Sequence, residues 1–501
     1  MPTPLNDDAH YLALKARDAR FDGRFFTGVT STGIYCRPVC KVRTPKRDNC
    51  RFFALAAQAE RAGFRPCLRC RPELAPRSDG LECANWSAQD GSAILAREAA
   101  RYLDATLQTG AHGSGTVLAT AQRLGISARH LQRIFEAQWG VSPLQYLQTR
   151  RLLAAKQLLT DTDLRVAQVA HLSGFASVRR FNAAFVGHYQ LQPTVLRKAG
   201  PQASGLRLQA SYRPPYDIAA MLGFLAQRGL DGVEHVDTAT ASIARTMAVD
   251  TPAGRLRGWV HCQLDAAQHR VALHISTALA PALPQVLARL RAWLDLDADP
   301  LAINAVLGAR FPGLDGLRVP GTVDGFELAV RAILGQQVTV AAGRTLTQRL
   351  VQRWGEDVAT PWPGLHKLFP SAHALAAVKP AELGELGVVR QRQQALIALA
   401  QAVYQGQLEL TPDAHVARTL AQLQALPGIG PWTAHYIAMR ALRWPDALPA
   451  NDVALQHALG VRLAPAPARA VEKAFAPWSP WRSYAVIRAW HAPTPTGADT
   501  P

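Results

Sequence analysis

Four cysteines stand in two closely spaced pairs near the start of the 501-residue chain. Cys36 and Cys40 form a C-x3-C pair, and Cys67 and Cys70 form a C-x2-C pair that follows after 26 intervening residues. Zinc is bound tetrahedrally by thiolates that arrive in such short-spaced pairs, because each pair spans one edge of the tetrahedron. The spacing therefore predicts one Zn²⁺ held by all four thiolates; the alternative is four unrelated buried thiols.

Basic side chains surround these cysteines in the sequence. Such a collar is suited to a phosphate backbone, whose charge attracts lysine and arginine. Its members are Arg37, Lys41, Arg43, Lys46, Arg47, Arg51, Arg65, Arg69 and Arg71.

The charge of the whole chain has the same sign as this collar. The net charge is +18, and residues 1–200 contribute +13 of it, with 28 Lys and Arg against 15 Asp and Glu. We therefore expect nucleic acid as the partner. No apolar run approaches membrane-spanning length and the N-terminus is polar, so we expect no membrane partner and a cytoplasmic protein. An odd total of seven cysteines argues against a disulfide framework.

Two similar segments, 116–139 and 165–188, each have the pattern of a helix–turn–helix. Gly125 and Gly174 are the expected turns, and Ser127 and Ser177 are the expected caps of the second helices. The expected inward stripe of the first helix is Val117, Leu118, Ala121 and Leu124.

Arginines fall on the outward face of the second helix of each copy. They are Arg129 and Arg133 in the first copy and Arg179 and Arg180 in the second. A recognition helix presents such side chains to the major groove of DNA. A helical bundle with solvated arginines is the alternative for either copy alone, but two copies beside a basic zinc module favour sequence-specific DNA binding.

A second candidate site lies near the C-terminus, where a glycine-containing turn precedes an aspartate. In LPGIG, Gly428 and Gly430 allow the backbone N–H groups and the start of the next helix to approach a phosphate. Asp452 follows 22 residues after Gly430. An isolated aspartate is usually a helix cap, but after such a hairpin the catalytic interpretation is the better one.

The N-terminal part of the chain resembles two known families. GISARHLQRIFEAQWGVSPLQYL resembles the AraC-type double helix–turn–helix, although YQLQP replaces the usual Gly-x-x-Pro of the second copy, which could alter the closing turn. Together with TGIYCRPVC and FFALAAQAERAGFRPCLRCRPE, residues 10–198 resemble the N-terminal half of Ada adaptive-response regulators.

The Ada resemblance implies a transcriptional activator that acts with RNA polymerase. It implies that Cys36 removes a methyl group from a methylated DNA phosphate, with Cys40, Cys67 and Cys70 as the remaining zinc ligands. It further implies phosphate contacts by Thr32, Arg43 and Arg69. Zinc with four thiolates has a net negative charge that repels DNA, and methylation of one thiolate removes one unit of that charge. Methylation should therefore raise the affinity for DNA.

Residues 211–491 resemble the helix–hairpin–helix DNA glycosylases of the AlkA family. The motifs are RPPYDIAAMLGFLAQR, FPGLDGLRVPGTVDGFELAVRAILGQQV and PWRSYAVIRAW, in addition to the hairpin. The resemblance implies that Asp452 is catalytic, that Gln337 wedges into the duplex and that a monovalent cation binds at the hairpin. It also implies that Trp432, Tyr436 and Trp490 line the base pocket, although core packing is the simpler interpretation of three scattered aromatics.

Two absences narrow the expected activity. Bifunctional members of the fold place a lysine directly after the hairpin, where this chain has Trp432, and no lysine occurs between Lys379 and Lys473. No PCHR-like motif of a second methyl acceptor occurs either. We therefore expect a monofunctional glycosylase for 3-methyladenine and 7-methylguanine, without O6-alkylguanine repair.

These observations predict a mainly α, multidomain chain. The expected domains are a four-cysteine zinc α/β module at 1–78, an AraC-type helical bundle at 90–199, an α+β antiparallel-sheet subdomain at 207–298, an all-α helix–hairpin–helix glycosylase domain at 299–491 and a disordered tail at 492–501. The leading hypothesis is a methyl-phosphotriester-sensing activator fused to an alkylpurine glycosylase, with double-stranded DNA as its partner. One alternative is an activator whose second half binds damaged DNA without excision; another is a purely structural zinc protein.

Overall fold

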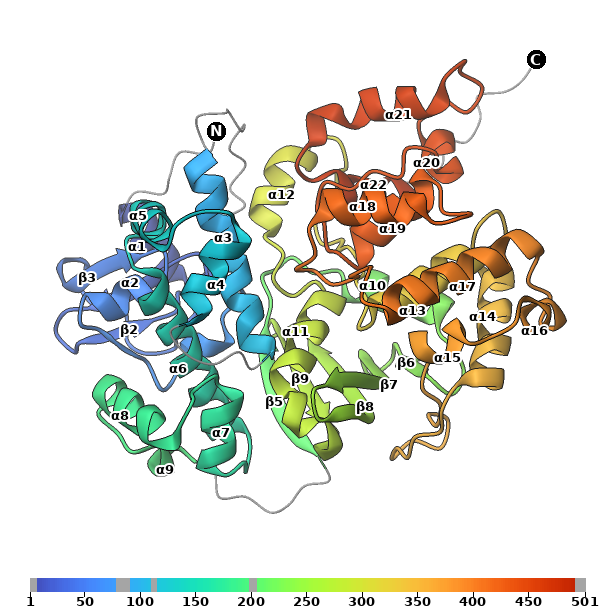
Figure 1. Cartoon of the computed structure of the whole chain (residues 1–501). Helices are drawn as coiled ribbons and strands as arrows, with labels where there is room; N and C mark the ends of the chain where they lie inside the picture. Colours follow the sequence, from blue (N-terminus) through green and yellow to red (C-terminus); the bar gives the residue numbers. More distant parts are fainter. Residues whose placement is uncertain (1–6, 78–90, 110–114, 198–204, 492–501) are drawn as a thin grey trace. The chain divides into compact units, whose positions relative to one another are not determined.

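The computed structural model describes residues 7–77, 91–109, 115–197 and 205–491, which form two compact units (Figure 1). The first unit comprises Met1–Pro214, Leu264–Ala288 and Leu296–Asp299, and the second comprises Pro215–Gln263, Arg289–Asp295 and Pro300–Pro501. The predicted tail at 492–501 lies outside the described residues, as do residues 78–90 and 198–204 at the predicted domain boundaries. The described chain is mainly helical with small sheets, as the sequence predicted.

The zinc module begins with α1 (Asp7–Ala16) and contains a four-stranded sheet of order β3-β1-β2-β4. Aromatic and β-branched residues favour these strands, and Phe26, Tyr35 and Phe64 lie in the core beneath them. Antiparallel pairing joins β1 to β2 and β3, whereas β4 runs parallel to β2. The remaining bounds are β1 (Phe26–Val29), β2 (Ile34–Cys36), β3 (Cys50–Phe53), β4 (Arg65–Pro66), α2 (Ala56–Arg61), and the short helices η1 (Ala19–Phe21), η2 (Arg47–Asn49) and η3 (Pro72–Leu74).

Seven helices follow: α3 (Gly91–Thr109), α4 (Gly115–Arg123), α5 (Ala128–Trp139), α6 (Pro143–Asp161), α7 (Val166–Leu172), α8 (Val178–Tyr189) and α9 (Pro193–Leu196). The caps predicted at Ser127 and Ser177 are confirmed, because each hydroxyl accepts a backbone N–H of the following helix turn. One predicted core position is wrong: Leu118 is 51% exposed. The long helix α6 connects the helix–turn–helix of α4 and α5 to that of α7 and α8.

Antiparallel strand pairs come next. In the first unit β5 (Leu206–Ser211) pairs with β9 (Arg270–Ile275), and in the second unit β7 (Ser242–Thr251) pairs with β6 (Glu234–Asp237) and β8 (Gly254–Asp265). Burial alternates along β9 and the start of β5, as a half-buried strand requires, whereas the first six residues of β7 are all buried. Three helical segments accompany them: α10 (Ile218–Arg228), η5 (Thr277–Ala282) and α11 (Leu283–Trp293).

The rest of the second unit is helical and is built around α13. Phe326–Ala329 and Ala332–Leu334 of this helix are all buried. The bounds are α12 (Pro300–Leu307), α13 (Gly325–Leu334), α14 (Val340–Trp354), α15 (Ala372–Ala376), α16 (Pro380–Glu385), α17 (Arg390–Tyr404), α18 (Val416–Ala425), α19 (Pro431–Arg440), α20 (Val453–Ala458), α21 (Pro467–Phe475), η6 (Ala476–Trp478) and α22 (Arg482–His491). Within the described ranges, no helix is both long and apolar enough to cross a membrane.

Candidate zinc centre and candidate base-excision site

The sulfur atoms of the four paired cysteines all lie within 4.8 Å of one another. A zinc ion with Zn–S bonds near 2.3 Å requires sulfur atoms about 3.8 Å apart, so the cluster fits the ion. The parallel pairing of β2 with β4 brings the two pairs together, since the Cys67 N–H bonds to the Tyr35 carbonyl at 3.0 Å, one residue before Cys36. Hydrogen bonding among the thiols raises the pKa of Cys36, so the four-thiolate form needs a cation to compensate its charge.

A backbone N–H group reaches the cluster at Cys70. The Arg37 N–H donates to Cys70 Sγ at 3.4 Å. A donated N–H withdraws electron density from a thiolate, so this bond lowers the nucleophilic character of the Cys70 sulfur.

The basic collar is only partly available to DNA. Thr32, Arg43 and Arg69 are exposed, as phosphate contacts would have to be. Arg37, by contrast, is 6% exposed, forms a bidentate pair with Asp22 and donates to the Cys70 carbonyl at 3.1 Å. Arg71 is likewise engaged, through Glu73 and Asp161. Arg37 and Arg71 are therefore engaged within the protein, because each pairs with a buried carboxylate.

The four arginines predicted on the recognition helices are all exposed. Arg129 and Arg133 lie on α5, and Arg179 and Arg180 lie on α8. The unusual YQLQP turn leaves the geometry unchanged: Gln190 ends α8 with φ 57° and ψ 26°, close to the φ 64° and ψ 10° of Gly140 at the end of α5. A glutamine here adopts the left-handed conformation that glycine adopts more easily.

In the second unit, Asp452 lies at the start of α20 and accepts three N–H groups. The indole Nε1 of Trp432 donates to Oδ2 at 2.8 Å, the indole of Trp490 donates to Oδ1 at 3.1 Å, and the Leu455 backbone N–H donates to Oδ1 at 2.9 Å. The cap interpretation is therefore confirmed, but a cap needs only the last of these bonds. The other two bonds come from the indoles of Trp432 and Trp490, which were predicted to line the base pocket, and they fix the orientation of the carboxylate.

Tyr436 stands among the same aromatic side chains. Its ring stacks on Trp432 at 5.4 Å between centroids and lies 6.4 Å from the Trp490 ring. Arg440 donates to the Tyr436 hydroxyl at 2.6 Å. Burial alone raises the pKa of a phenol, but the Arg440 and Arg228 guanidiniums outweigh it and lower the pKa of Tyr436. Sequence reasoning missed Arg440, although its place one helical turn after Tyr436 was a usable signal.

The predicted hairpin joins α18 to α19, and its two glycines differ. Gly428 has φ +76°, and a side chain there would lie 3.2 Å from the Ala395 Cβ, whereas a Cβ at Gly430 would meet nothing within 4 Å. Gly430 thus leaves open space at the start of α19, as the approach of a phosphate requires. Gln336, which the sequence did not single out, donates to the Gly428 carbonyl at 3.0 Å and to Thr433 at 2.8 Å. Gln337, the predicted wedge, is exposed with φ +52° between α13 and α14.

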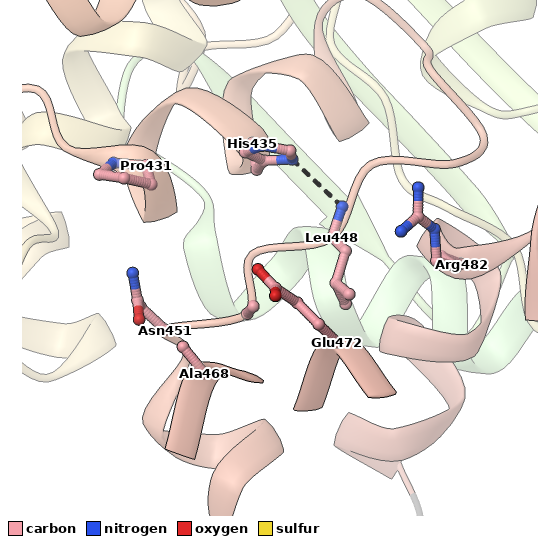
Figure 2. A pocket seen from close by; sticks show the side chains of 8 residues that line it. Pro431, His435, Leu448, Asn451, Ala468, Glu472 and Arg482 are labelled. Atoms are coloured by element: carbon pink, nitrogen blue, oxygen red, sulfur yellow. Dashed lines mark hydrogen bonds between the residues drawn. The ribbon is translucent and has the colours of Figure 1, made fainter. Parts of the chain in front are cut away.

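A cavity of about 290 Å³ adjoins the loop that carries Asp452 (Figure 2). None of the three predicted base-pocket aromatics lines it, so it is a separate feature. The Leu448 N–H donates to His435 Nδ1 at 3.3 Å, and Arg482 pairs with Asp446 at 2.7 Å, so both side chains hold the loop. The lining residues are Pro431, His435, Leu448, Ala450, Asn451, Ala468, Glu472 and Arg482.

Comparison with known proteins gives four family matches in succession along the chain. They are the metal binding domain of Ada at residues 9–73, a helix-turn-helix domain at 120–199, the AlkA N-terminal domain at 206–324 and the HhH-GPD superfamily of base excision DNA repair proteins at 330–478. The resemblances predicted from the sequence are thereby confirmed.

Individual relatives match either the whole chain or one part of it. The chain is 37% identical over 503 residues to a probable bifunctional transcriptional activator/DNA repair enzyme AlkA of Mycobacterium tuberculosis, with 97% of both chains covered. It is 38% identical over 281 residues to DNA-3-methyladenine glycosylase 2 of Escherichia coli, which covers 56% of this chain and 95% of the relative. It is 35% identical over 161 residues to the bifunctional transcriptional activator/DNA repair enzyme Ada of Escherichia coli, which covers 32% of this chain and 41% of the relative.

The matched domains and the four-cysteine cluster define a DNA-binding protein with one zinc centre and a base-excision repair module. Within that class, the chain belongs to the family of bifunctional transcriptional activator/DNA repair enzymes.

Proposed function

We propose that this protein transfers a methyl group from a DNA methyl phosphotriester to Cys36, activates transcription in that methylated state, and excises N3- and N7-alkylated purines as a monofunctional DNA glycosylase. RNA polymerase is the proposed partner in activation, and the cytoplasm is the proposed location. The domain boundaries predicted from the sequence remain part of the proposal, as do the Gln337 wedge and the monovalent cation at the hairpin. The similar proteins are named as transcriptional activators, DNA repair enzymes or both, and these names support the methyl-transfer half and the excision half of the proposal.

The observation that carries the methyl transfer is the cluster of four cysteine sulfur atoms, Cys36 among them, that all lie within 4.8 Å of one another. Bound zinc keeps the thiols deprotonated at neutral pH. The Cys36 thiolate attacks the methyl carbon, a C–S bond forms, and the C–O bond to the phosphotriester breaks. The electron pair of that bond leaves with the phosphate, which becomes an ordinary negatively charged diester. The product on the protein is a thioether, so each molecule reacts once.

The charge change at Cys36 supports the switch in DNA affinity. A thiolate becomes a neutral thioether, so one negative charge facing the DNA disappears. The exposed Arg43 and Arg69 then act on the phosphate backbone with less opposition. The affinity difference between the methylated and unmethylated forms should shrink as salt rises, because the lost term is electrostatic.

The methyl transfer is tested by mass spectrometry after incubation with duplex DNA that carries methyl phosphotriesters. One methyl should appear on the peptide that contains Cys36, and Cys36→Ala should abolish it. Cys50→Ala is the matched control, because Cys50 is buried in the same module but lies outside the cluster. A methyl on Cys50 instead of Cys36 would refute the assignment.

The excision half rests on Asp452 and its three N–H donors. A carboxylate fixed in this way can face the positive charge that develops on the sugar as the glycosidic bond breaks, and can position the attacking water. The aromatic rings of Trp432, Tyr436 and Trp490 supply the stacking surface for a flipped base. An alkylated purine is cationic, so each good aromatic contact favours it by roughly 0.5–2 kcal/mol, and flipping is cheaper for a damaged base.

Release of free base from alkylated duplex DNA tests this half. Asp452→Asn keeps the hydrogen-bonding shape and should bind DNA but lose most excision. Asp357→Asn, also in the second unit, is the matched control and should leave excision unchanged, because its carboxylate is 83% exposed and pairs with Lys367. Undiminished excision by Asp452→Asn would show that Asp452 is not the catalytic carboxylate. DNA binding by the wild-type protein without any excision would favour the alternative, a damage-binding activator. A complex trapped with borohydride would contradict the monofunctional assignment.

A further inference from the structure

A buried lysine of α6 contacts the backbone of a zinc ligand. Lys156 is completely buried, and its Nζ donates to the Cys67 carbonyl at 3.1 Å and to Glu73 Oε2 at 2.7 Å. Cys67 is a ligand of the zinc module, whereas α6 is the helix between the two helix–turn–helix copies. An ammonium group without water needs such partners, because an unpaired buried charge is strongly unfavourable.

A second link joins the other end of the same ligand loop to α6. Arg71 directly follows the ligand Cys70 and adopts the left-handed conformation, with φ 56°. Its guanidinium donates to Glu73 Oε1 at 3.0 Å, to Thr160 Oγ1 at 2.9 Å and to Asp161 Oδ1 at 2.7 Å. The loop from Cys67 to Arg71 is therefore fixed at both ends to the last turns of α6.

A third contact connects β2, the strand that ends at Cys36, to the second helix–turn–helix. The Tyr35 hydroxyl donates to Glu60 Oε1 at 2.9 Å, and the His188 imidazole of α8 lies 3.1 Å from the same oxygen. Thr149 of α6 donates to the other Glu60 oxygen. The carboxylate of Glu60 thus joins the zinc module, α6 and α8.

Stability alone does not account for an ionic link at Lys156. Replacement of a buried ion pair by apolar residues of similar volume is often neutral or stabilising, whereas the ionic pair fixes a particular arrangement. The arrangement fixed here is that of the Cys67–Arg71 loop relative to α6. Helix α6 connects the two helix–turn–helix units. A ligand loop that is fixed to α6 therefore keeps the zinc centre and both helix–turn–helix units in one rigid arrangement.

We propose that Lys156, Glu73 and Arg71 form a coupling link that makes the DNA affinity of the helix–turn–helices depend on methylation of Cys36. The inference rests on the proposed methyl transfer and adds to it. The local loss of charge favours only the contact of the zinc module with DNA. The link lets the zinc module, α5 and α8 bind one duplex together. The gain in free energy at the zinc module on methylation therefore raises the affinity of the whole molecule for DNA.

The test compares DNA affinities of the methylated and unmethylated full-length protein. The probe is a duplex selected from a random-sequence library by the methylated wild-type protein, at one fixed salt concentration. In the double variant Lys156→Met/Glu73→Gln, methyl transfer to Cys36 and zinc content should persist. The ratio of the two affinities should fall at least fivefold, the lower end of typical coupling between sites. The loss should arise in the methylated form, in which the zinc module contributes to binding.

Two further variants keep the result decisive. Asp161→Asn removes the ionic part of the Arg71 link from the α6 side, leaves the bond to Thr160, and does not change the ligand loop. It should also lower the ratio, so the coupling can be tested even if the double variant fails to fold or to hold zinc. Arg150→Met/Asp104→Asn is the matched control, since this pair at 2.9 Å joins α6 to α3 and leaves the zinc module untouched. It should leave the ratio unchanged.

The outcomes separate the coupling from the function on which it rests. The coupling would be refuted if the double variant and Asp161→Asn both kept the wild-type ratio of methylated to unmethylated affinity. It would also be refuted if the Arg150→Met/Asp104→Asn control lowered that ratio equally. A wild-type protein that accepts no methyl, or that binds equally well in both forms, would instead refute the proposed function itself.

Discussion

Replacement of Trp432 by phenylalanine separates two roles that the structure combines in one side chain. The indole N–H holds the Asp452 carboxylate at 2.8 Å, and the ring stacks on Tyr436 at 5.4 Å and 11° between planes. Phenylalanine keeps an aromatic face but cannot donate the hydrogen bond. A hydrogen bond to a charged group contributes about 1.5–3 kcal/mol, so loss of this bond should slow excision by roughly 10- to 150-fold.

Single-turnover release of 3-methyladenine and of a normal purine from otherwise identical duplexes measures both roles. With Trp432→Phe, both rates should fall by a similar factor, so discrimination between the two bases should persist. With Trp432→Ala, the stacking surface is lost as well, and discrimination should weaken. Trp490→Phe is the parallel variant, because its indole donates to the other carboxylate oxygen at 3.1 Å. A wild-type rate for Trp432→Phe would refute the idea that the indole positions Asp452.

Three other outcomes follow from the backbone and from burial. Gln190→Gly should stabilise the first unit by about 1 kcal/mol in urea unfolding, because a left-handed conformation costs a non-glycine residue roughly that much; an unchanged midpoint would contradict this. Gly430→Ala should keep the fold but weaken DNA binding, whereas Gly428→Ala, at φ +76°, should lower the unfolding midpoint. Burial lowers the pKa of His435 below 6.5, so the unfolded chain binds this proton more readily and stability should fall as the pH drops below about 6.5. His435→Gln should flatten that part of the pH profile.

Local patterns in the sequence were sufficient for several parts of the site. The zinc ligands follow from spacing, because two short-range pairs need only one strand pairing to meet. The caps at Ser127 and Ser177 and the cap at Asp452 follow from residue type next to a helix start. The hairpin at Gly428 is equally local.

The failures concern partners that are distant in the sequence. The sequence placed Arg37 in the basic collar around the cysteines, but it did not indicate that Arg37 is buried and pairs with Asp22, 15 residues before it. The donation from Trp432 to Asp452 crosses 20 residues and needed the packing of α19 against the start of α20. Leu118 fits a helical stripe but lies on the exposed side of α4. The spacing of apolar residues predicts which face of a helix is buried, but the width of the buried face depends on the neighbouring elements that pack against it.

The division of the chain into two compact units places Cys36 and Asp452 in separate bodies. On the proposed function, the first residue reacts once and the second turns over repeatedly. A population of these molecules would therefore keep a cumulative record of past exposure in its methylated fraction, while every molecule, marked or unmarked, continues to clear damaged bases. The record is erased only by dilution through new synthesis, so the persistence of the response is set by the lifetime of the polypeptide rather than by the lifetime of the lesion.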